Sequence, residues 1–157
     1  MLRRLAVITV AGMLPCAPAG ALDITFSGTV ANTCTLAVST PGILALSSDG
    51  TTLGSNQPGG LAAMVTVISI GSNTITVGAP SRTAQPSGYD GSGEQVEVAY
   101  SGVSGLSGID QDWGTDSSSF TVGMLVSATA LTVHNRITNT SGFAQGSYQT
   151  KTVLTCS

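Results

Sequence analysis

Side chains from Asp23 to Val38 alternate between two kinds with a period of two residues. Every second position from Ile24 is mostly large and apolar, and the positions between are small or polar. This period is typical of a strand that buries one face. The alternation runs longer than a typical strand of about 5–6 residues. We therefore expect a long first strand that bends or changes sheets near Ala31 and Asn32.

The rest of the chain also predicts strands rather than helices. It is rich in Thr, Val, Gly and Ser, and no amphipathic helix of useful length is apparent. We expect an all-β fold, an antiparallel sandwich or barrel of about seven to nine short strands. We expect residues 78–93 and 102–116 to be irregular. The predicted strands are Ala62–Ile70 in the centre, Thr74–Val77 as its hairpin partner after a turn at Gly71–Asn73, Glu94–Tyr100, Phe120–Val122, Ala128–Val133 and Tyr148–Cys156.

The first 21 residues are expected to be a secretory signal peptide. Arg3 and Arg4 are followed by an apolar run, Leu5–Leu14, and by small residues at Ala19 and Ala21. We expect cleavage after Ala21, with Ala19 as the alternative, which leaves residues 22–157 as a single domain. No later segment has 18 consecutive apolar residues, so we expect no membrane insertion. The expected location is the periplasm, the cell surface or the exterior.

Charge is scarce in the expected mature chain. Arg82, Arg136 and Lys151 oppose eight acidic residues, a net charge of −5 over residues 22–157. Nucleic-acid binding requires a basic face, which this composition does not provide. We therefore expect no nucleic-acid partner.

Two cysteines, Cys34 and Cys156, remain after removal of the signal peptide. An even pair in an oxidising compartment indicates a disulfide. Chain-entropy arithmetic for a loop of this length gives about 4.9 kcal/mol of stabilisation. Two free thiols are the alternative, and a zinc site has only His134 to add as a ligand.

The opening motif resembles that of a known family. Ile24, Phe26, Gly28 and Val30, followed by Cys34, are similar to the start of chaperone–usher fimbrial subunits, the pilins. The closing segment Gly146-Ser-Tyr148, with the alternating Thr, Val and Leu after it, resembles the end of pilin and spore-coat-U-like secreted subunits.

The resemblance implies an immunoglobulin-like sandwich that lacks one strand. A neighbouring subunit supplies that strand from its N-terminal extension, by β-strand addition. The donated residues would include Ile24, Phe26, Gly28 and Val30, and the partners would be a periplasmic chaperone and like subunits, in an oligomer or fimbrium. Only twelve mature residues precede Cys34, and Cys156 lies at the end of the chain. The alternative is a domain that is complete by itself.

An acidic segment with the single tryptophan is the main candidate for ligand binding. Asp110, Asp112 and Asp116 offer carboxylates, although their spacing differs from that of an EF-hand. Trp113 offers an aromatic platform for a sugar. A solvated loop is the alternative interpretation. The second functional hypothesis is therefore a secreted carbohydrate- or calcium-binding module, which would also use the loop around Tyr89.

Catalysis is not expected. His134 is the only histidine, and no G-x-S-x-G motif accompanies it. We expect a non-enzymatic structural or adhesive surface protein with no metal and no cofactor. Asn139-Thr-Ser141 matches a glycosylation sequon, a short motif that is common by chance.

Overall fold

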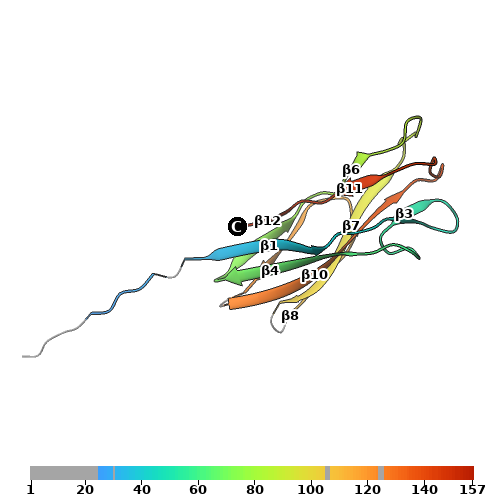
Figure 1. Ribbon diagram of the computed structural model, residues 1–157. Coiled ribbons are helices and arrows are strands. Elements are labelled where there is room, and N and C mark those ends of the chain that lie inside the picture. Colours follow the sequence, from blue (N-terminus) through green and yellow to red (C-terminus); the bar gives the residue numbers. More distant parts are fainter. Residues whose placement is uncertain (1–24, 30, 105–106, 124–125) are drawn as a thin grey trace, which may run out of the picture.

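The computed structural model describes residues 25–29, 31–104, 107–123 and 126–157. These residues form twelve strands and no helix, so the fold is all-β (Figure 1). The predicted signal peptide, Ile24 and Val30 lie outside the described residues. The strands are β1 (Thr33–Thr40), β2 (Ala45–Leu46), β3 (Thr52–Gly54), β4 (Ala63–Ile70), β5 (Asn73–Val77), β6 (Ser81–Ala84), β7 (Gln95–Ser104), β8 (Ser107–Gly114), β9 (Ser118–Val122), β10 (Val126–Thr138), β11 (Gln149–Lys151) and β12 (Leu154–Cys156).

The largest sheet has seven strands and is organised by β10. This strand is 13 residues long. It pairs with β4 and then β3 along one edge and with β7 along the other, always antiparallel. The sheet continues from β4 to β1, from β3 to β2 and from β7 to β8.

Two smaller sheets complete the fold, with the orders β12-β5-β9 and β11-β6. Alternate side chains of the seven-stranded and three-stranded sheets meet in one buried cluster, as the period-two pattern requires. Its members are Val65, Val67, Val98, Tyr100, Ile109, Leu131 and Val133 from the large sheet, and Ile75, Val77 and Val122 from the three-stranded sheet.

The central strand is confirmed, but its predicted hairpin is wrong. β4 lies between β1 and β10, as expected for the most apolar run of the expected mature chain. β5 does not pair with β4, because the chain crosses to the three-stranded sheet between them. Gly71, with φ of 80°, makes the turn. A side chain there would collide with Asn32, so glycine suits both the backbone and the space.

The long N-terminal strand is only partly confirmed. β1 begins at Thr33, and the described residues Thr25–Thr29 form no strand. Phe26 is 91% exposed, so it does not fill the interior of its own chain. Figure 1 shows this blue segment extending from β1 away from the sheets. It is the described part of residues 22–31, which precede β1 and which we call the arm.

Several of the twelve observed strands lie in polar segments where no strand was predicted. Residues 102–116 were expected to be irregular, but most of them form the end of β7 and all of β8. The predicted loop at 78–93 contains β6. The predicted strand Tyr148–Cys156 is divided into β11 and β12. Gly, Ser and Asp weaken the apolar alternation that identifies a strand.

One buried hydroxyl weakens the core. Thr129 is 1% exposed on the inner face of β10, and its Oγ1 has no hydrogen-bond partner among the described residues. Burying an unpaired hydroxyl costs free energy. We expect Thr129→Val, which has nearly the same shape, to raise the free energy of unfolding by about 1 kcal/mol in urea denaturation.

The control is Thr121→Val on the exposed face of β9, where the change is expected to stay within about 0.5 kcal/mol. A Thr129→Val protein that is no more stable than the wild type would contradict this account of the core.

Candidate functional site

A groove of about 570 Å³ separates β1 from the C-terminal segment. β4 and β10 form its floor, and the chain between β1 and β2 contributes to its wall. Its lining is mostly apolar. The lining residues are Val38, Gly42, Ile43, Leu44, Ser55, Ala63, Val65, Val133, Asn135, Tyr148, Gln149, Thr150, Lys151, Thr152 and Leu154.

The groove exposes side chains that belong to the inner face of the sheet. Alternation along β1 places Val38 on the same face as Cys34 and Leu36, which pack against the core. Val38 is nevertheless 68% exposed, and nearby Ile43 is 53% exposed. The groove is therefore a part of the apolar interior that no strand covers.

Both strands beside the groove have an unpaired edge. Within the described ranges, β1 pairs only with β4, and β11 pairs only with β6. An unpaired edge presents free N–H and C=O groups to an additional strand. β1 carries no charged residue, whereas the opposite edge strand, β8, carries the exposed Asp110 and Asp112. Charge protects an edge from strand pairing, so β8 has this protection and β1 lacks it.

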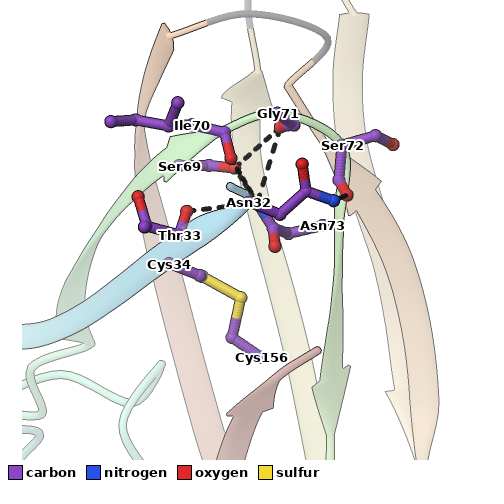
Figure 2. The surroundings of a disulfide bond; sticks show 9 residues. All are labelled: Asn32, Thr33, Cys34, Ser69, Ile70, Gly71, Ser72, Asn73 and Cys156. Carbon is purple, nitrogen blue, oxygen red and sulfur yellow. Dashed lines mark hydrogen bonds between the residues drawn. A yellow bond between two sulfur atoms is a disulfide. The ribbon is translucent and has the colours of Figure 1, made fainter. Parts of the chain in front are cut away.

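A disulfide closes one end of the groove. The predicted Cys34–Cys156 bond is confirmed, with a Cα–Cα distance of 6.3 Å (Figure 2). It joins β1 to β12, and both half-buried cysteines pack against the core. Farther from the disulfide along these two segments, Val38 and Thr152 line the groove. The first and last segments therefore meet at the disulfide and separate beyond it.

A buried amide fixes the same end. Asn73 is 5% exposed, and its Nδ2 lies 2.6 Å from Oγ of Ser69 and 3.2 Å from the carbonyl oxygens of Thr33 and Ile70. Figure 2 shows these bonds converging above the disulfide. They attach the start of β1 to the turn between β4 and β5.

Asn135 attaches the C-terminal segment to the floor of the groove. Its Nδ2 donates to Oγ1 of Thr150 at 3.1 Å, and its Oδ1 accepts from Oγ1 of Thr152 at 3.0 Å. Its backbone N–H donates to Oγ of Ser55 at 3.1 Å. Because this polar side chain is satisfied within the chain, the groove offers mainly apolar surface and backbone edges to a ligand.

The predicted acidic ligand loop is a strand and a turn instead. Asp110, Asp112 and Trp113 lie on β8, and Asp116 follows it. The Arg136 guanidinium lies 4.3 Å from the centre of the Trp113 ring and therefore occupies one face. Glu97 holds this guanidinium with contacts of 2.7 and 3.1 Å. In the part of the chain that the structure describes, no three His, Cys, Asp or Glu side chains are grouped to hold a metal ion.

His134 contacts a serine that the sequence analysis did not identify. Its Nδ1 lies 3.0 Å from Oγ of Ser55. Ser55 is 6% exposed and also accepts the backbone N–H of Asn135. His134 lies on β10 between the residues that pair with β4 and those that pair with β3. We therefore assign the Ser55–His134 contact a structural role in packing this part of the sheet.

An aromatic cluster supports the loops at the other end of the fold. Tyr89 is 7% exposed, its ring stacks on that of Phe143, and it makes a T-shaped contact with the ring of Tyr148. The sequon residue Asn139 is 2% exposed and donates to the Tyr89 hydroxyl at 2.8 Å. Its side-chain nitrogen is therefore not available for glycosylation in the folded chain, and Tyr89 is not an exposed platform.

Comparisons with known protein families, curated proteins and solved structures found no match to this chain. Among the described residues, no helix has the length and hydrophobicity needed to cross a membrane. The groove and the residues around it therefore carry the functional argument.

The cluster around Tyr89 predicts alkaline sensitivity. Burial raises the pKa of Tyr89 above its ordinary value of 10.0, and the Glu94 carboxylate acts in the same direction. Above about pH 10 the unfolded chain loses this proton before the folded chain does. The free energy of unfolding should fall as the pH rises through this region, and Tyr89→Phe should reduce the fall in urea denaturation.

Tyr148→Phe is the matched control, because it retains Tyr89 and should keep the alkaline loss of stability. A loss of equal size in Tyr89→Phe and the wild type would assign the effect to other groups.

The disulfide should contribute strongly to stability. We expect replacement of both Cys34 and Cys156 by Ser to lower the free energy of unfolding by about 2–5 kcal/mol. Urea denaturation measures the change, and the wild type in reductant should show a similar loss. Equal stability of the oxidised wild type and the double variant would contradict the prediction.

Proposed function

We propose that this chain is an exported structural or adhesive surface protein of pilin-like type, which acts by strand complementation. Its fold in this proposal is an immunoglobulin-like β-sandwich that lacks one strand. The buried cluster shared by the seven-stranded and three-stranded sheets supports a sandwich. The partners would be like subunits and a periplasmic chaperone.

The uncovered groove is the observation that carries the proposal. It combines an apolar floor with the unpaired edges of β1 and β11. An added strand gains main-chain hydrogen bonds from such an edge and buries alternate side chains in the apolar floor. These are the two contributions that a missing strand would supply.

The arm has the complementary chemistry. Ile24, Phe26 and Val30 are apolar and alternate with Thr25 and Thr29. The described part of the arm, residues 25–29, is exposed and belongs to no sheet. An extended segment of this kind is available for donation to a neighbour.

Export is supported by two features. The first 21 residues have the sequence pattern of a signal peptide. The Cys34–Cys156 disulfide is compatible with an extracellular or periplasmic location.

Peptide binding tests the groove directly. A fluorescent peptide with the sequence of residues 22–32 should bind the chain that lacks those residues, as measured by anisotropy. Phe26→Asp in the peptide should weaken binding at least tenfold, because burying an unpaired carboxylate is costly. Thr25→Asp, on the opposite face of the peptide, is the matched control and should have little effect.

A second arm of the experiment concerns the acceptor. Val38→Arg should reduce binding without unfolding the domain, because Val38 is already exposed. Absence of binding, or equal binding of the Phe26→Asp and Thr25→Asp peptides, would contradict strand complementation.

A further inference from the structure

Lys151 is a cation at the rim of the groove that is not committed to an ion pair. The described residues contain two ion pairs, Arg82 with Glu94 and Arg136 with Glu97, each at 2.7 Å. Lys151 belongs to neither pair, is exposed and lines the groove. Each of the other two cations of the expected mature chain therefore has a carboxylate partner, and Lys151 has none among these residues.

The side chain of Lys151 lies on the solvent side of its strand. Its neighbours Thr150 and Thr152 turn inward and bond Asn135 on the floor. Successive side chains of a strand point to opposite faces, so Lys151 faces outward.

The arm carries one charged side chain, and alternation assigns it to the same side. Asp23 has the only charged side chain between the expected cleavage site and β1. A strand that inserts Phe26 and Ile24 into the groove turns Asp23 and Thr25 toward solvent. Opposite charges on the same face of adjacent strands attract, with Cβ atoms about 4.5–5.5 Å apart.

We infer that Lys151 pairs with Asp23 of a second copy of this chain and so sets which strand enters the groove and in which register. The inference rests on the proposed strand complementation and names the donor and the residues that select it. A shift of one residue would reverse the faces of the donated strand, burying Asp23 and exposing Phe26.

The position of the arm favours a second copy over the same chain as donor. The arm leaves β1 beside the disulfide, at the closed end of the groove, and extends away from the domain. Cys34, the second residue of β1, is bonded to Cys156 of β12 at this end. Phe26 of the arm is 91% exposed, so the arm is accessible to a neighbouring copy.

A charge exchange tests the pairing. Sedimentation equilibrium of the mature chain should show self-association that Asp23→Lys and Lys151→Glu each weaken about fivefold, the range expected for reversal of an exposed ion pair. The double variant, and an equimolar mixture of the two single variants, should recover association. Higher salt should reduce the difference between the wild type and the single variants.

Asp116→Lys is the matched control for Asp23→Lys, since it makes the same change in net charge at an exposed position away from the groove. It should leave association unchanged. Single variants that associate like the wild type, or a double variant that does not recover, would overturn the pairing.

The outcomes also separate this inference from the proposed function. A wild type that stays monomeric, while the arm peptide still binds the arm-deleted chain, would overturn donation between copies but not strand complementation. If the peptide fails to bind and association is independent of the arm, both fail.

Discussion

The link between the first and last strands is the constraint on which the rest of this structure depends. The Cys34–Cys156 bond holds β1 against β12, and the Asn73 amide joins the start of β1 to the turn between β4 and β5. Beyond the disulfide the two segments separate, and the same link that closes the core at one end defines the groove at the other.

The site is an incompletely covered core rather than a set of reactive groups. Asn135 on its floor is bonded within the chain to Thr150 and Thr152. What remains available is apolar surface, two unpaired strand edges and the Lys151 ammonium. This combination matches an extended peptide with alternating apolar residues better than it matches a small polar ligand, which would need free directional donors and acceptors.

Elements that a local run of residues identifies could be predicted from the sequence. Elements that depend on which strands pair with each other could not. The apolar, β-branched run that became β4 was recognisable, and so was the disulfide, because only two cysteines follow the expected signal peptide. β8 was missed because Asp110 and Asp112 on an edge strand weaken the apolar alternation. The crossing from β4 to β5 and the exposure of Val38 depend on distant segments. The inference about Lys151 required the structure, because it depends on both other cations of the expected mature chain being paired.

The unequal edges of the seven-stranded sheet have a consequence for aggregation. Two copies that met through their β8 edges would bring Asp110 and Asp112 of one copy against the same carboxylates of the other, and like charges would repel. The β1 edge carries no such charge. Of these two edges of the seven-stranded sheet, the β8 edge is therefore protected by charge against growth of the sheet and the β1 edge is not.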